Sequence, residues 1–179
     1  AVRPALRHHH CMAFDAARDV VVLFGGRGLV WPNAPDDTWT WNGVDWLLLQ
    51  PSMAPPGRGG ANMVYDSGRQ RIVLFGGHGS NLDPRMLDDT WEWDGVSWLQ
   101  RTPLHAPAAR YDFAMAYDAA RACTVLFGGS GLGPLRFGDS WTWDGTDWTQ
   151  LAPTHSPSAR QAPAMTYDSA RARCVLFGG

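Results

Sequence analysis

The amino-acid sequence predicts an all-β protein built from a repeated unit of about 50 residues, and three observations support this. Phe-Gly-Gly recurs at that spacing, at Phe24, Phe75, Phe127 and Phe177, and a fixed period of this length is typical of repeat architectures. Short runs of alternating apolar and polar residues flank Asn-Gly or Asp-Gly, which is the strongest short-range hairpin signal. Hydrophobic residues make up 45% of the chain and aromatic residues 12%, which indicates an ordered globular core.

Each complete repeat contains four short strands, which we call a, b, c and d. In the second repeat we expect strand a at Asn62 to Tyr65, strand b at Arg71 to Phe75, strand c at Asp89 to Trp93 and strand d at Ser97 to Gln100. Strands a and b form an inner hairpin, and strands c and d form an outer hairpin around Asp-Gly. Isolated hairpins are marginal in water, so these strands must pack against neighbouring repeats.

The inner hairpin occurs four times, near residues 10–26, 61–77, 113–129 and 163–179, whereas the outer hairpin occurs three times, at residues 36–50, 87–100 and 138–150. The repeats therefore cover approximately residues 1–51, 52–103, 104–153 and 154–179. We expect a single arc over residues 1–179 with three complete four-stranded units and the inner hairpin of a fourth.

The paired aromatics TWTW, TWEW and TWTW, the Trp after each Asn-Gly or Asp-Gly, and the double Gly that ends strand b resemble kelch repeats over essentially the whole chain. This resemblance implies a β-propeller similar to the central domain of galactose oxidase, with each repeat as one blade. The second aromatic of strand c is Trp, where kelch repeats usually have Tyr. No residues match the copper centre of galactose oxidase, so the resemblance carries no oxidase activity, and we expect no cofactor.

Propellers typically need four to eight blades to close, so three and a half blades leave an open arc. We expect the sequence to be a piece of a longer polypeptide, or another chain to complete the half blade by strand addition. Self-association through the open blade edges is a third possibility.

Antiparallel order places the b–c loops and the d–a links on one face of the arc, where the sequence varies most between repeats. We expect binding residues there, because variable loops on a rigid scaffold commonly carry function.

A recurring Arg precedes each strand a, and the four guanidiniums could converge to bind an acidic peptide or a sugar acid. The alternative is that each Arg pairs with a nearby carboxylate, such as Asp36, Asp37, Asp88, Asp89 or Asp139, and fixes blade register. The candidate binding residues are Arg7, Arg58, Arg110, Arg160, Trp31, His78, Arg85 and Arg136.

Three consecutive His residues form the one local cluster with metal-ligand chemistry. Neighbours on a strand point to opposite faces, so His8 and His10 could share a metal that His9 could not easily join. They are weak candidates, and we expect no metal site. We interpret the cysteines, which show no metal-type spacing, as small buried hydrophobic residues.

These observations favour a non-catalytic scaffold that recognises a protein or a glycan through the b–c loops and d–a links. The alternatives are the propeller part of a secreted carbohydrate-active enzyme whose catalytic residues lie elsewhere, and a self-assembling structural protein.

A net charge of −2 and a pI near 6.3 argue against a nucleic-acid partner. No apolar run approaches the ~20 residues of a membrane span. Arg supplies all 15 cationic side chains, which we attribute to a GC-rich, bacterial genome or to selection for Arg pairing. A secreted or periplasmic location is favoured over a cytoplasmic one.

Overall fold

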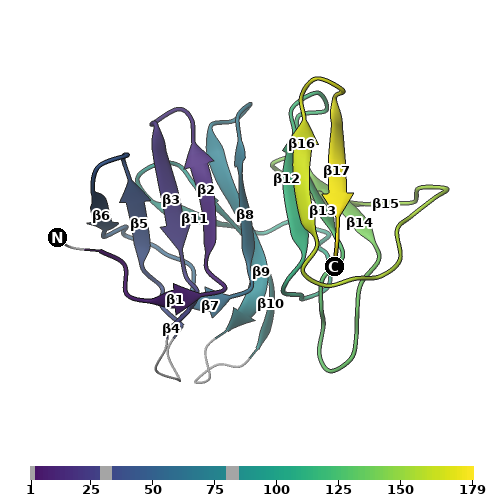
Figure 1. The fold of residues 1–179 in the computed structure, drawn as a ribbon, viewed down its shortest axis with the longest axis horizontal. Coiled ribbons are helices and arrows are strands. Elements are labelled where there is room, and N and C mark those ends of the chain that lie inside the picture. Colours follow the sequence, from purple (N-terminus) through teal and green to yellow (C-terminus); the bar gives the residue numbers. More distant parts are fainter. Residues whose placement is uncertain (1–2, 29–33, 80–84) are drawn as a thin grey trace.

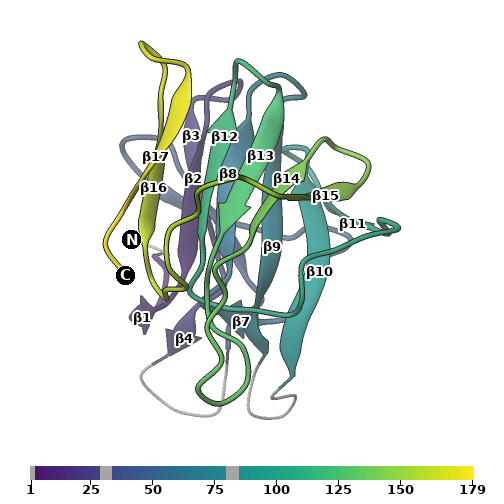
Figure 2. The same cartoon turned by 90° about the vertical axis from the view of Figure 1, so that its right-hand side faces the viewer.

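The computed structural model describes residues 3–28, 34–79 and 85–179, and within these ranges every regular element is a β-strand. Two four-stranded antiparallel sheets, one five-stranded sheet made of four blade strands and the short β7 (Arg58–Gly59), and one two-stranded hairpin lie side by side as the blades of an open arc (Figures 1 and 2). The predicted fold class, with three complete blades and the inner hairpin of a fourth, is confirmed. None of the described elements is a helix long and apolar enough to cross a membrane.

The strand order within each blade follows the chain. Blade 1 consists of β2 (Cys11–Asp15), β3 (Val20–Phe24), β5 (Thr38–Trp41) and β6 (Trp46–Leu49). Blade 2 consists of β8 (Asn62–Asp66), β9 (Arg71–Gly79), β10 (Met86–Trp93) and β11 (Trp98–Arg101). Blade 3 consists of β12 (Ala114–Asp118), β13 (Cys123–Phe127), β14 (Ser140–Trp143) and β15 (Trp148–Leu151). The half blade consists of β16 (Ala164–Asp168) and β17 (Arg173–Phe177).

Two additional short pairings lie where the chain enters strand a. In blade 1, β1 (Arg7–His8) pairs with β4 (Arg27–Gly28), and in blade 2, β7 (Arg58–Gly59) pairs with the end of β9. Both pairings lie at the bottom of Figure 1, on the side opposite the turn between β16 and β17. We call this side the loop face, because the d–a links and the b–c loop of blade 3 also reach it (Figure 2).

The core consists of two apolar layers between successive blades, and strand b contributes to both layers. Ile72 and Leu74 pack with Phe24 of blade 1, whereas Val73 and Phe75 pack with residues of blade 3. Successive side chains of a strand point to opposite faces. A strand covered on both faces must therefore be apolar at every position, which explains the continuous Val-Leu-Phe run before each Gly-Gly.

The double glycine at the end of strand b allows the next blade to approach. Gly76 has a φ of +59°, and a Cβ atom there would lie 2.8 Å from the Arg110 carbonyl oxygen. Gly77 also has positive φ, and its N–H donates to the same carbonyl at 2.8 Å. Because a side chain would meet backbone at this position, only glycine fits without displacing the neighbouring blade.

Candidate functional site: the loop face

The recurring Arg residues of the loop face are held in buried ion pairs within three of the four blades. Arg58 donates two hydrogen bonds to Asp89, from Nη1 to Oδ1 at 2.5 Å and from Nη2 to Oδ2 at 2.8 Å. The same two-point pairing joins Arg7 to Asp37 and Arg110 to Asp139. The Arg58 and Arg110 side chains are fully buried, and that of Arg7 is nearly so.

Each guanidinium is also fixed by backbone carbonyls of its own blade. In blade 2, Arg58 Nη1 donates to the Gly76 carbonyl at 3.0 Å, and Nε donates to the Pro56 carbonyl at 3.0 Å. Trp91 Nε1 donates to Asp89 Oδ2 at 2.7 Å. Burial by itself raises the pKa of Asp89, but the hydrogen bonds and charge of Arg58, with the Trp91 hydrogen bond, bring that pKa below its usual value. The carboxylate is therefore held ionised.

The backbone of the same Arg residues joins successive blades. The carbonyls of Arg58, Arg110 and Arg160 accept hydrogen bonds from Gly26, Gly77 and Gly129 of the preceding blade, at 2.8, 2.8 and 2.9 Å. Two residues after each Arg, the backbone has positive φ, at His9, Gly60, Asp112 and Ala162. These four residues form a chain of hydrogen bonds from blade to blade: Gly60 N to His9 O, Asp112 N to Gly60 O and Ala162 N to Asp112 O.

This geometry supports the structural alternative for Arg7, Arg58 and Arg110, which fix the register within and between blades. Their guanidiniums do not form the exposed converging ring that would bind an acidic ligand. Arg160 differs from the other three. It keeps the contacts to backbone, with Nη1 to the Gly178 carbonyl at 2.9 Å and Nε to the Ser158 carbonyl at 3.1 Å. Within the described residues it has no carboxylate partner, since none of the described strands pairs with the other edge of β17.

The other candidate binding residues do not gather at one point. His78 lies in β9, where its ring contacts the Gly79 carbonyl and the edge of Tyr111. Arg85 is exposed and lines a pocket on blade 2 with Asp88 and Gln100. Arg136 is exposed in the b–c loop of blade 3, where it donates to the Leu135 carbonyl at 3.0 Å. Trp31 lies outside the described residues.

The strand alternation expected through the His cluster is wrong. Strand β1 ends at His8, and His9 has a φ of 54°, so the chain bends between His8 and His10. The rings of His8 and His9 contact each other, with centroids 4.7 Å apart. Partial burial and the charge of Arg7 lower the pKa of His10. In the described part of the chain, no three His, Cys, Asp or Glu residues are grouped to hold a metal.

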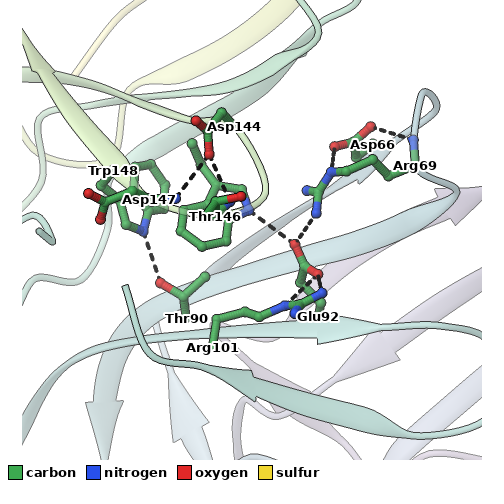
Figure 3. Close-up of polar contacts among 10 residues, drawn as sticks. Asp66, Arg69, Thr90, Glu92, Arg101, Asp144, Thr146, Asp147 and Trp148 are labelled. Carbon is green, nitrogen blue, oxygen red and sulfur yellow. Dashed lines mark hydrogen bonds and ion pairs between the residues drawn. The ribbon is translucent and has the colours of Figure 1, made fainter. Parts of the chain in front are cut away.

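The sequence-based reasoning missed one buried polar cluster, which lies between blades 2 and 3 (Figure 3). Glu92 is 1% exposed and accepts hydrogen bonds from Arg69 Nη1 at 2.5 Å and Arg101 Nη2 at 2.5 Å. Trp143 Nε1, from blade 3, donates to the same carboxylate at 3.1 Å. Arg69 also pairs with Asp66 at 2.7 Å. The Trp143 hydrogen bond joins the two blades, and the buried Glu92 carboxylate is compensated by two guanidiniums, as a buried charge requires. Arg69 Nη2 is buried and has no hydrogen-bond partner among the described residues.

The signal for this cluster was present in the repeat alignment. Glu92 stands where the other complete blades have Thr40 and Thr142, and Arg101 stands where they have Leu49 and Leu151. A charged pair that replaces two neutral residues in one repeat indicates a local contact. The alignment could not show that Arg69 and Trp143 complete it, because these residues come from a turn and from another blade.

The repeated Trp residues of blades 2 and 3 pack in the core, where all are buried except the half-buried Trp141. Trp98 Nε1 donates to Thr38 Oγ1 of blade 1 at 2.9 Å, and Trp148 Nε1 donates to Thr90 Oγ1 of blade 2 at 2.9 Å. The rings of Trp98 and Trp148 pack against Phe24 and Phe75, respectively. Each indole therefore joins its blade to the preceding one through both its ring and its N–H.

The cysteines are free thiols. Cys11 is buried, and burial raises its pKa to about 12. Cys123 and Cys174 are half-buried, and burial raises the pKa of Cys174 to about 11. The interpretation of buried thiols is thus confirmed for Cys11 and only partly for the other two.

No protein-family model matches this chain, and no curated protein is significantly similar to it. The repeat pattern and the blade geometry are therefore the basis for the proposal below.

Proposed function

We propose that this chain is a non-catalytic, kelch-type propeller scaffold that binds a partner through its loop face. The kelch assignment is supported by the four-stranded blades together with the Gly-Gly, Trp-x-Trp and Asp-Gly signatures at matching positions. The observation that carries the binding proposal is a difference between the repeating and the variable side chains of the loop face. In the three complete blades the repeating Arg and Asp side chains are used internally in ion pairs, whereas the b–c loops, which differ in sequence between blades, expose other side chains such as Leu132 and Leu135.

The b–c loop of blade 3 is the best described part of this variable surface. It exposes Leu132 and Leu135, at 74% and 50%, beside the exposed guanidinium of Arg136. Backbone hydrogen bonds hold the loop in place: Gly131 N donates to the Leu135 carbonyl, and Phe137 N donates to the Gly129 carbonyl. Exposed leucines next to an Arg suit a protein segment better than a neutral sugar, because protein interfaces combine an apolar centre with Arg at high frequency.

A comparison of two surface variants tests this proposal. The loop variant combines Leu132→Ser, Leu135→Ser and Arg136→Ser. The control variant combines Val44→Ser and Val96→Ser, two exposed residues in the c–d turns. Both variants and the parent chain are screened against a glycan array and a panel of peptides and proteins. We expect any ligand of the parent to bind the control variant equally and the loop variant at least ~10-fold more weakly.

Two outcomes would contradict the proposal. Equal loss of the ligand in both variants would mean that the loop face is not the binding surface. Oxidation or hydrolysis of an array glycan by the parent chain would instead support the alternative of a carbohydrate-active enzyme.

A further inference from the structure

One of the tight c–d turns carries an amide where the turns of the other complete blades carry a carboxylate. The turn of blade 1 contains Asn42-Gly43, whereas those of blades 2 and 3 contain Asp94-Gly95 and Asp144-Gly145. Asn42 is exposed. Asp144 is also exposed although blade 2 precedes its blade, so the exposure belongs to the turn itself. An Asn followed by Gly can react with its own backbone, because glycine has no Cβ to shield its nitrogen.

The backbone of the turn prepares the Asn42 side chain for such a reaction. Oδ1 of Asn42 accepts hydrogen bonds from Val44 N at 2.9 Å and from Asp45 N at 2.8 Å. Two N–H donors on one carbonyl oxygen polarise the carbonyl and stabilise the oxyanion that forms when a nucleophile adds to its carbon. The turn therefore places an oxyanion hole on the side-chain carbon Cγ.

The backbone nitrogen of Gly43 is the nucleophile for this carbon. It directly follows Asn42, so its attack on Cγ closes a cyclic imide within the turn. Among the described residues, the Gly43 N–H has no hydrogen-bond partner, so no hydrogen bond must break before the nitrogen reacts. Gly43 has a φ of +92°, and glycine adopts this conformation without the strain that a side chain would bring.

From this geometry we propose that Asn42 is a site of spontaneous deamidation, for which the turn supplies both the nucleophile and the oxyanion hole. In the first step, Gly43 N bonds to Asn42 Cγ and the Cγ–Nδ2 bond breaks. The proton that Gly43 N loses leaves with the amide group as ammonia. In the second step, water opens the imide. Attack at Cγ gives aspartate and restores the normal peptide bond, whereas attack at the main-chain carbonyl gives isoaspartate.

The same two N–H donors favour aspartate over isoaspartate. They remain on Oδ1 in the imide, where they polarise the Cγ carbonyl and direct water to it. Aspartate also fits the turn, because Oδ1 of Asp94 and of Asp144 accepts the corresponding two backbone hydrogen bonds, at 2.7 to 2.9 Å. Isoaspartate instead lengthens the main chain by one carbon between the paired residues Trp41 and Trp46. Deamidation therefore makes the blade 1 turn chemically equivalent to the turns of blades 2 and 3.

The product carries one additional negative charge beside Asp45. This charge lies in a c–d turn, at the opposite end of strand c from the b–c loop. The inference thus goes beyond the proposed function of the loop face and does not depend on it.

Peptide mapping of the aged chain tests the proposal. The folded chain is incubated at mildly alkaline pH and digested, and mass spectrometry with chromatographic separation quantifies the aspartate and isoaspartate peptides. The same incubation in urea gives the unfolded comparison. We expect conversion at Asn42 in the folded chain. Its aspartate-to-isoaspartate ratio should be at least ~3-fold higher than in the unfolded chain, because only the fold holds both N–H donors on Oδ1.

Asn62 is the matched control within the same chain. It lies in β8, is followed by Met63, and its Nδ2 donates to the Phe113 carbonyl at 3.1 Å. We expect at least ~10-fold less conversion there, because the strand does not bring the next nitrogen to an activated Cγ. Conversion at Asn62 as fast as at Asn42 would contradict a role for the turn.

The variant Asn42→Asp is the direct product and tests whether the turn accepts it. It should unfold at the same urea concentration as the parent chain, because its carboxylate can accept both turn hydrogen bonds. An unmodified Asn42 after incubation of the folded chain, or the same product ratio in the folded and unfolded chain, would overturn the proposal. A lower unfolding midpoint for Asn42→Asp would contradict the expected fit of aspartate in the turn.

Discussion

Blade 2 and the half blade contain nearly the same inner-hairpin motif, yet their equivalent residues have opposite environments. Phe75 is fully buried between Phe113 and Trp148, whereas Phe177 is 82% exposed. Arg58 is buried in an ion pair, whereas Arg160 is half-buried and has no carboxylate partner in the described chain. The difference shows that burial in this fold is decided by the neighbouring strands and blades rather than by the local sequence.

The largest expected effect comes from the two phenylalanines. Phe75→Ala should lower the free energy of unfolding by about 4 kcal/mol, since it removes a buried ring and leaves a cavity. Phe177→Ala should change it by less than about 0.5 kcal/mol, because an exposed ring loses few contacts. Urea denaturation followed by Trp fluorescence measures both values. Similar losses in the two variants would show that Phe177 is covered in solution.

The two arginines sharpen the same comparison. Arg58→Met should cost about 3 kcal/mol, because it leaves the Asp89 carboxylate without its cation in a mostly buried site. Arg160→Met should cost less than about 1 kcal/mol, since no carboxylate loses a partner. The same urea measurement separates the two. A large loss for Arg160→Met would mean that its contacts to the Gly178 and Ser158 carbonyls already stabilise the half blade.

A smaller effect is expected at the strand d tryptophans. Trp148→Phe removes the indole N–H that donates to Thr90 and should cost about 2 kcal/mol, from the hydrogen bond together with the lost ring area. Trp46→Phe, in blade 1, should cost less, because Trp46 is only half-buried and no described residue accepts its N–H. Thermal denaturation monitored by circular dichroism provides the comparison. An equal loss at Trp46 would show that the outward face of blade 1 is also covered.

The last expected effect is a gradual change of the free energy of unfolding with pH. Burial by itself raises the pKa values of Asp37, Asp89 and Asp139, but the guanidinium partners bring each below its ordinary value. A carboxylate with a lowered folded pKa stabilises the protein above its unfolded pKa, and this stabilisation is lost as the pH falls through the folded pKa. The free energy of unfolding should therefore decrease as the pH falls below about 4. Arg58→Met should show a shallower decrease, and an unchanged slope would exclude Asp89 as a contributor.

The two ends of the arc also differ in a way that the repeat alignment alone could not interpret. Tyr65 and Tyr167 accept hydrogen bonds from turn N–H groups of the preceding blades, Ala17 N at 3.2 Å and Ala120 N at 3.1 Å. Blade 1 has Phe14 at this position, and its ring is exposed. Phe14 has no hydroxyl to make that contact, and no described blade precedes it.

Much of the fold could be predicted because its signals are local. Asn-Gly and Asp-Gly fix tight turns, and alternation identifies each strand. The Gly-Gly pairs mark positions where a side chain would clash with neighbouring backbone. Strand bounds in blade 2 were predicted closely at strand a, whereas β9 and β10 extend further, to Gly79 and from Met86. The extra residues pair on the loop face with each other and with β7, which is a tertiary contact without a local signal.

The candidate site was predicted less well for the same reason. The positions of the recurring Arg and Asp residues were evident, but whether a guanidinium faces a ligand or a carboxylate depends on the distance between loops some 30 residues apart. The positive φ of His9 and the meeting of Glu92 with Trp143 likewise depend on neighbouring blades.

The sequence by itself therefore determined the repeat and the hairpins, including the inner hairpin of a fourth blade, because turn chemistry and strand alternation act over a few residues. Only the tertiary structure decided which copies of the same residue are buried. Packing and ion pairing need a second strand or blade at contact distance, and Arg160 and Phe177 keep the motif without that neighbour.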